Sequence, residues 1–268
     1  MNTPLVIREE KSQDFHASEV VVRRAFFNRQ NPGCNEHYLV HVLRGSPDYL
    51  AQLSRLAVKD GRIVGAIYFS KAFLKASQGV VPVLTFGPLA VDPVFQGQGI
   101  ARTLFEETRD LAREAGYPAI IIYGEPEYYP RLGFRRAKEF GITDPQGEVY
   151  DPLMVYELHP DALKGIQGKF FESPVFEKAN DQKALAEFDN LFPSCPKLKV
   201  PSQWLHENDL GQVLGVEGQH YEIAFWEIAI PAVLAKSYSS PAPKVGDYVT
   251  FRWNHTGLSQ IQTLEIPE

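Results

Sequence analysis

The sequence predicts an α/β protein of the α+β type, in which helices flank a mixed and mostly antiparallel sheet. Two apolar runs separated by Asp60-Gly61 predict a hairpin, because this pair favours a two-residue turn. Apolar strands are expected at Leu84–Val91 and 119–123, and an amphipathic helix at 99–115 connects them. A helical crossover makes those two strands parallel neighbours in one sheet.

The first third of the chain alternates short strands and helices before the hairpin. A strand at 4–9 precedes a helix over 12–27, for which Ser12 and Asp14 are plausible caps. The turn Asn31-Pro32-Gly33 ends it, and a second helix is expected at 36–43. Three strands in a meander follow, at Leu50–Val58, Arg62–Phe73 and from about Val81.

Beyond the central helix the pattern predicts further strands and then a second region. Strands are expected at Arg135–Phe140, Leu153–Leu158 and Lys169–Phe176. The domain boundary is placed after residue 176, so that 1–176 form the main domain and 177–268 a smaller, β-rich extension. The expected elements of the extension are a helix at 180–192 capped by Asn180 or Asp181, an apolar stretch at 222–235, and paired strands at 244–253 and 261–266.

Composition limits the classes of function. The chain has 268 residues, 44% hydrophobic and 22% charged, with a net charge of −6. The extension is acidic, with 7 Lys and Arg against 12 Asp and Glu, so we expect no nucleic-acid partner. No apolar run is long enough to span a bilayer, and no signal peptide is evident, so no membrane contact is expected. Two cysteines, Cys34 and Cys195, favour a reducing, cytoplasmic location over a disulfide framework.

Two histidines stand at a spacing that can hold a metal ion. His37 and His41 are four residues apart on the second helix, but no further ligand pattern accompanies them. We therefore interpret them as surface or packing residues and expect no metal.

A turn rich in glycine and glutamine, Gln96-Gly97-Gln98-Gly99, marks the start of the central helix. The free N–H groups and the positive dipole end of a helix N-terminus can hold a phosphate. The Walker pattern fails, because Ile100-Ala101 stand where it needs Lys and Ser or Thr. The dinucleotide fingerprint is half met, with Arg102 in place of its third glycine. A turn that only starts a helix is the remaining alternative.

The run from Leu89 to Leu104 closely resembles motif A of the GNAT superfamily of acyl-CoA-dependent N-acyltransferases. The core pattern Gln/Arg-x-x-Gly-x-Gly/Ala is met by Gln96, Gly99 and Ala101, and Tyr-x-x-x-Gly-Phe follows as Tyr129, Gly133 and Phe134. The resemblance covers residues 4–160 and is closest to a bacterial branch of unassigned substrate. It implies a sheet whose central parallel strands splay apart.

The resemblance also implies a cosubstrate and a mechanism. Acetyl-CoA would lie along the strand and the turn, with its pyrophosphate on the helix N-terminus. The residues that the resemblance implies for this cofactor site are Leu89, Ala90, Val91, Gln96, Gly97, Gln98, Gly99, Ile100, Ala101 and Arg102. An acceptor amine would attack the thioester directly in a ternary complex. Tyr129 would then protonate the thiolate, since a phenol of pKa about 10 suits a thiol of about 8.5.

Two departures from the family pattern concern the groups that would transfer protons. Pro130 after Tyr129 disfavours a regular helix there, so we expect a distorted turn, with Tyr128 as the alternative acid. Gly124-Glu125 stand where many members have asparagine, and none of Glu125, Glu127 and Asp92 is assigned as the general base. The amine acceptor is left open.

The rival classes of function are a CoA-binding regulatory or structural module and, less favoured, a dinucleotide-binding oxidoreductase. The extension could cover the acceptor side, mediate a homodimer or bind a partner.

Overall fold

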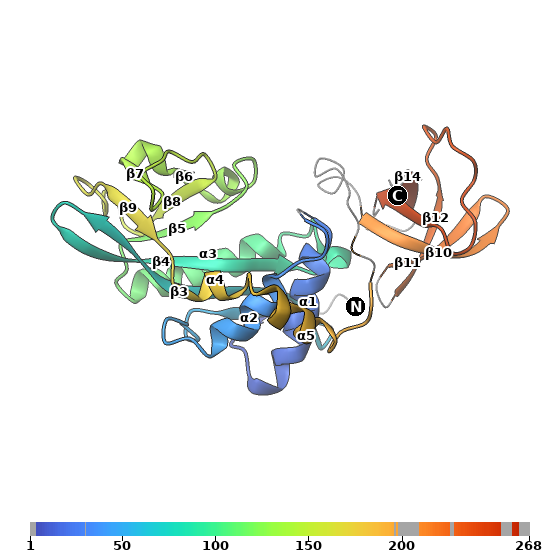
Figure 1. Cartoon of the computed structure of the whole chain (residues 1–268), viewed down its shortest axis with the longest axis horizontal. Helices are drawn as coiled ribbons and strands as arrows, with labels where there is room; N and C mark the ends of the chain where they lie inside the picture. Colours follow the sequence, from blue (N-terminus) through green and yellow to red (C-terminus); the bar gives the residue numbers. More distant parts are fainter. Residues whose placement is uncertain are drawn as a thin grey trace. The chain divides into compact units, whose positions relative to one another are not determined.

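The computed structural model describes residues 4–29, 31–195, 197, 209–225, 228–252 and 259–262, and these form two compact units (Figure 1). The first unit comprises residues 1–23, 35–92 and 96–194. The second comprises 24–34, 93–95 and 195–268. Each unit has its own sheet and its own apolar core.

A mixed sheet forms the centre of the first unit, and its described strands follow the order β1-β2-β3-β4-β5-β8-β6. A further strand, β9, pairs with β3 and with β7. Most pairs are antiparallel, whereas β4–β5 and β7–β9 are parallel. The strands are β1 (Val6–Arg8), β2 (Arg55–Lys59), β3 (Arg62–Ala76), β4 (Gly79–Val91), β5 (Ala119–Tyr123), β6 (Arg135–Arg136), β7 (Ile142–Thr143), β8 (Leu153–Glu157) and β9 (Gly168–Phe171). The predicted fold class is thus confirmed.

Five α-helices of the described residues accompany these strands. They are α1 (Phe15–Phe26), α2 (Glu36–Arg44), α3 (Ile100–Glu114), α4 (Val175–Lys178) and α5 (Gln182–Asp189). The central helix, α3, buries one stripe of side chains and packs on β2, β3 and β4. Short 3-10 helices connect other elements: η1 (Ser12–Asp14), η2 (Pro93–Phe95), η3 (Tyr129–Leu132) and η4 (Ala137–Phe140).

The predicted hairpin is confirmed, and the strands around it differ in extent from the prediction. Asp60 and Gly61 both have positive φ, 51° and 74°, as a two-residue hairpin turn requires. Residues 50–53 form a turn instead of the start of a strand, because the Ser54 N–H and hydroxyl both bond to the Leu50 carbonyl.

Two other predicted strands were too long at their C-terminal ends. The prediction of a strand at 135–140 was wrong after Arg136, because the Glu139 carboxylate accepts the Arg136 N–H and Gly141 closes the turn at φ 66°. The strand predicted at 169–176 ends at Phe171, and α4 occupies 175–178.

Aromatic packing keeps α5 in the first unit. The Asp181 carboxylate caps α5 by accepting the N–H groups of Lys183 and Ala184 at 3.0 and 3.1 Å. The buried His37 side chain of α2 lies 3.0 Å from the Asp189 carboxylate and against the rings of Phe188 and Phe192. The first unit therefore continues to Ser194, beyond the expected boundary at residue 176.

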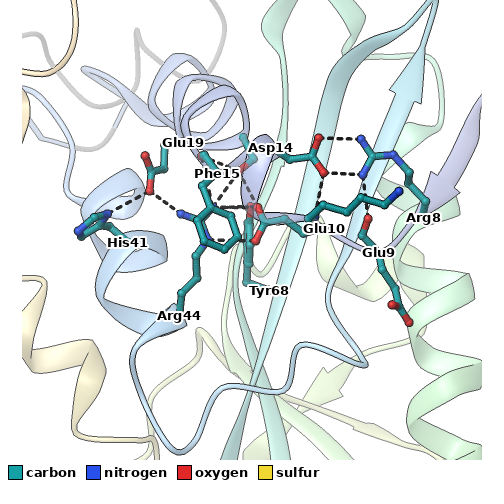
Figure 2. A network of polar contacts seen from close by, with 11 residues as sticks. Arg8, Glu9, Glu10, Asp14, Phe15, Glu19, His41, Arg44 and Tyr68 are labelled. Carbon is teal, nitrogen blue, oxygen red and sulfur yellow. Dashed lines mark hydrogen bonds and ion pairs between the residues drawn. The ribbon is translucent and has the colours of Figure 1, made fainter.

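A buried ionic cluster attaches α1 and α2 to β3 (Figure 2). The Arg44 guanidinium donates to both oxygens of Glu10, at 2.8 and 3.0 Å, and also to Glu19. The Tyr68 hydroxyl of β3 donates to the same Glu10 carboxylate at 2.7 Å. We call Glu10, Glu19, Arg44 and Tyr68 the Arg44 cluster. Because its members are almost fully buried, it fixes the positions of both helices on the sheet.

The second unit contains a closed five-stranded barrel with the order β10-β11-β12-β14-β13. Its strands are β10 (Asp209–Glu217), β11 (His220–Phe225), β12 (Ile228–Leu234), β13 (Tyr248–Arg252) and β14 (Ser259–Gln262). β12 and β14 are parallel, and the other described pairs are antiparallel. This arrangement is that of the small Greek-key barrels called OB-folds. The expected β-rich extension is confirmed.

The sequence pattern located several of the barrel strands correctly. The apolar stretch 222–235 forms β11 and β12, which pair antiparallel, and β13 pairs with β14 as expected. Side chains of β10 to β14 such as Ile223, Phe225 and Phe251 fill the interior. The three tryptophans of the extension, Trp204, Trp226 and Trp253, and residues 263–266 of the last predicted strand lie outside the described residues.

Candidate active site

The candidate active site begins where β4 and β5 separate. Their parallel pairing is limited to Leu84 and Ile120. From there β4 continues to Val91, paired on its other edge with β3. A bulge lies at Gly87-Pro88, where two residues of β4 oppose Tyr68 alone. Bulges bend strands, and Pro88 has no N–H to donate, so both features favour the separation.

The free edge of β4 contains three of the predicted cofactor residues. Leu89, Ala90 and Val91 end the strand and pair with Ile67, Ala66 and Gly65 of β3. Their other edge has no strand partner among the described elements. An extended ligand with amide groups can hydrogen-bond to such an edge as an added strand would.

The glycine turn leads from this edge to α3. Gly97 and Gly99 have φ of 73° and 81°, so both occupy the left-handed region that favours glycine. The Gln96 side chain donates to the Val91 carbonyl at 3.0 Å, and Lys59 donates to the Gln98 side chain at 3.0 Å. Residues 97–99 are exposed, which leaves their backbone accessible.

The N-terminus of α3 is suited to an anion. Gly99 is its N-cap, no side-chain cap is formed, and the first turn, Ile100-Ala101-Arg102, contains no acidic residue. The first N–H groups of a helix lack intrahelical partners and carry partial positive charge. Gly65 allows this end to lie close to β3, since an added Cβ there would be 3.0 Å from the Ala90 carbonyl oxygen and 3.2 Å from the Ile100 side chain.

Tyr129 lies on the other side of the separation, at the start of η3. A short 3-10 helix with Pro130 and a left-handed Gly133 replaces a regular helix, as the sequence predicted. The Tyr129 ring packs on Phe86 of β4 and on Phe134, with centroids 6.0 and 5.4 Å apart. The Arg102 guanidinium donates to the Arg131 carbonyl at 3.0 Å and connects η3 to the first turn of α3.

The packing of Tyr129 explains why this chain has Gly124 where many members of the GNAT superfamily have asparagine. The sequence alone offers no reason for this departure. A Cβ at this position would lie 2.4 Å from Cδ2 and Cε2 of Tyr129. The ring of Tyr129 therefore occupies the space of a side chain at 124. A residue larger than glycine there would displace the tyrosine.

The environment of Tyr129 keeps its phenol protonated. Burial raises the pKa of Tyr129 well above its usual value, and the nearby side chains of Tyr128 and Glu125 act in the same direction. Burial also raises the pKa of Tyr128, although Arg102 and Arg131 oppose this shift. Both phenols are thus protonated at neutral pH.

The carboxylates near the motif in sequence differ in exposure. Glu125 and Glu127 are exposed, and Asp92 is buried. Sequence reasoning missed a different carboxylate, Glu172, which follows β9 and reaches Thr85 of β4. No motif marks Glu172, because only the pairing of β9 with β3 brings it to this sheet.

Metal-binding groups and membrane-spanning helices are both absent from the described residues. No group of three or more His, Cys, Asp or Glu side chains there could hold a metal ion. Within the same part of the chain, no helix is both long and apolar enough to cross a membrane.

Comparison with known proteins finds relatives that match the part of the chain containing the motifs described above. A family model described as an acetyltransferase (GNAT) domain matches residues 52–136. YhbS of Escherichia coli K12, an uncharacterized N-acetyltransferase, is 32% identical over 165 residues, which are 61% of this chain and 93% of YhbS. YjhQ of the same organism, also an uncharacterized N-acetyltransferase, is 35% identical over 82 residues, 31% of this chain and 45% of YjhQ.

Solved structures agree with this similarity. The crystal structure of E. coli YhbS in complex with CoA superposes with a TM-score of 0.58 at 29% identity, covering 65% of this chain and 93% of YhbS. A GNAT family acetyltransferase from Brucella melitensis in complex with acetyl-CoA gives a TM-score of 0.53 at 25% identity, covering 65% of this chain and 99% of that protein.

Proposed function

This chain belongs to the GNAT family of N-acetyltransferases, and we propose that it transfers an acetyl group from acetyl-CoA directly to an amine in a ternary complex. The observation that carries the proposal is the arrangement of β4, the glycine turn, α3 and Tyr129. The free edge of β4 leads toward a helix N-terminus without a side-chain cap, and the Tyr129 ring packs on Phe86 of β4 near the point where β4 and β5 separate.

This arrangement has the chemistry that CoA requires. The pantetheine arm carries amides that suit the free edge of Leu89, Ala90 and Val91. The pyrophosphate suits the backbone of residues 96–102, where two glycines allow close approach and the helix dipole favours negative charge. The CoA complex of YhbS and the acetyl-CoA complex of the Brucella protein support this assignment.

In the proposed reaction the amine attacks the thioester carbonyl and the C–S bond breaks. Tyr129 supplies a proton to the leaving sulfur, because its phenol is held neutral beside β4. Residues 35–194 include all the site residues and contain no cysteine, which favours direct transfer over a covalent acyl-cysteine.

The test is release of free thiol from acetyl-CoA across a panel of amines. Tyr129→Phe should lower kcat by about 10²- to 10⁴-fold and leave the affinity for CoA unchanged, since only the proton is removed. Tyr117→Phe, beyond the far end of α3, is the matched control and should behave as wild type. Equal kcat for Tyr129→Phe and wild type would remove the assigned role of Tyr129.

A further inference from the structure

A small polar cluster lies on β3 and β4 close to the point where β4 leaves β5. Ser70 and Thr85 oppose each other across the β3–β4 pair, and both are fully buried. The Thr85 hydroxyl donates to Oε1 of Glu172 at 3.5 Å. Glu172 reaches Thr85 because it follows Phe171, which pairs with Phe73 of β3. Leu84, the last partner of β5, is adjacent to Thr85.

The cluster and Tyr129 approach the separation from opposite faces of the sheet. Thr85 shares its face with Val83, and Ser70 shares its face with Ala72, because alternate residues of a strand point the same way. Phe86 points to the other face, where it contacts Phe105 of α3 and Tyr129. A thioester lying between β4 and β5 would therefore have Tyr129 on one side and Glu172 on the other.

Polar side chains on the Glu172 face of the sheet are not all paired with other described residues. Among the described residues, the buried Ser70 hydroxyl has no hydrogen-bond partner, and Glu172 forms no ion pair. Tyr123, at the end of β5, shares this face with Ile121 of the same core. A hydroxyl and a carboxylate left in this state suit a ligand that donates hydrogen bonds and carries positive charge.

Thr85 and Tyr123 are two neutral groups that interact with Glu172. Burial raises the pKa of Glu172 to about 7, although the Thr85 hydrogen bond opposes the shift. Burial also raises the pKa of Tyr123 to about 12, with smaller contributions from Glu172, Asp144 and Tyr150. On the neighbouring residue, the Ser173 hydroxyl donates to Asp48 at 2.7 Å.

We propose that Ser70, Thr85 and Glu172 form the binding site for the acceptor amine, and that Glu172 is the base that removes its proton. The inference rests on the proposed function. A carboxylate that titrates near neutral pH can accept a proton and release it again within each cycle. None of these three side chains is a cation that could pair with an acceptor carboxylate, so the acceptor class is an ammonium with no carboxylate beside the nitrogen. Tyr123 and Tyr150, with ring centroids 6.0 Å apart, offer aromatic faces to it.

The protons balance in this scheme. The acceptor enters as R–NH3+ and gives one proton to the Glu172 carboxylate. The lone pair of R–NH2 forms the C–N bond at the thioester carbonyl, and the C–S bond breaks with its electron pair going to sulfur. Sulfur takes the Tyr129 proton, the second nitrogen proton returns to the Tyr129 phenolate through solvent, and Glu172 releases its proton to water.

The test compares Glu172→Gln with Glu177→Gln, an exposed residue of α4, in the full chain. Thiol release from acetyl-CoA is followed between pH 5.5 and 9 with spermidine, tyramine and lysine methyl ester, and with glycine as the carboxylate-bearing amine. Wild type and Glu177→Gln should lose kcat/KM below about pH 7, because Glu172 must be ionised to accept a proton. The kcat/KM of Glu172→Gln should be about 10²- to 10⁴-fold lower at pH 8 and should show no further fall below about pH 7.

The outcomes separate this inference from the proposed function. If Glu172→Gln keeps its CoA affinity and its kcat/KM no longer falls below about pH 7, the result supports Glu172 as the base. A wild-type rate and pH profile in Glu172→Gln would overturn it while leaving acetyl transfer intact, and faster turnover of glycine than of the three other amines would overturn the acceptor class. A wild-type enzyme that binds no CoA, or that turns over none of the amines, would remove both proposals.

Discussion

At the scale of single residues, the site depends on one glycine that has no role in sequence motifs. Gly124→Ala should push the Tyr129 ring away, because the new Cβ would lie 2.4 Å from it. We expect kcat to fall by about 10- to 100-fold, since small misplacements of an acid are costly, while CoA affinity stays unchanged. Gly45→Ala, whose Cβ would lie 3.7 Å from its nearest neighbour, is the control for a glycine substitution in general. Equal losses in both variants would contradict the packing argument.

Glu172 should also make the free energy of unfolding depend on pH. Its folded pKa of about 7 exceeds the unfolded value near 4.5, so the folded state is favoured below pH 4.5 and loses that advantage as the pH rises through about 7. Glu172→Gln removes this loss and should raise the free energy of unfolding by about 3 kcal/mol at pH 8 but by less than about 1 kcal/mol at pH 5. Urea denaturation of this variant, wild type and Glu177→Gln at both pH values is the measurement. A gain of the same size at pH 5 would show that titration is not the cause.

At the scale of elements, the N-terminus of α3 can be tested with matched glycines. Gly99 and Gly116 flank the helix, both have φ near 80°, and neither would place a Cβ within 4 Å of another atom. Gly99→Glu should weaken CoA binding by about 30-fold or more, roughly 2 kcal/mol, because it puts negative charge at the proposed phosphate site. Gly99→Ala carries the same backbone strain without the charge and should weaken binding far less. Calorimetry with CoA distinguishes them, and Gly116→Glu should bind as wild type does.

The Arg44 cluster joins three elements and should matter for folding more than for catalysis. Arg44→Met leaves the Glu10 and Glu19 carboxylates buried without their cation, which costs about 3–5 kcal/mol in comparable sites. Lys138→Met removes an exposed ion pair with Asp151 and should cost far less than Arg44→Met, because solvent screens exposed charges. Urea denaturation at neutral pH compares the two. Similar losses would show that the cluster is not the principal attachment of α1 and α2.

The elements that the sequence predicted correctly are those that depend on residues close to one another in the chain. Positive φ at Gly97 and Gly99, the apolar stripe of α3 and the Asp60-Gly61 turn each depend on a few neighbouring residues. The error at 137–140 arose because a Glu139 cap competes with strand pairing. Glu172 and Gly124 could not be predicted, since their contacts depend on how β9 and η3 pack against strands distant in sequence.

At the scale of the whole molecule, the boundary between the units shows which unit contains the residues of the proposed site. The proposed cofactor and acceptor residues all belong to residues 35–92 and 96–194, and α5 joins the same unit through His37 and Asp189. The barrel strands β10–β14 have a separate apolar core. The role of the extension as a cover, a dimer surface or a partner module is therefore a question distinct from CoA binding.

A chain ending at Ser194 should fold and bind CoA within about threefold of the full-length protein, because it retains β4, the glycine turn and α3. A chain ending at residue 176 should be less stable, since it lacks the Phe188 and Phe192 rings that pack on His37. Calorimetry and thermal unfolding of the two truncations against the full chain measure both effects, and thiol release on the same amines shows whether the barrel affects turnover. Loss of CoA binding in a folded 1–194 chain would place part of the cofactor site in the second unit.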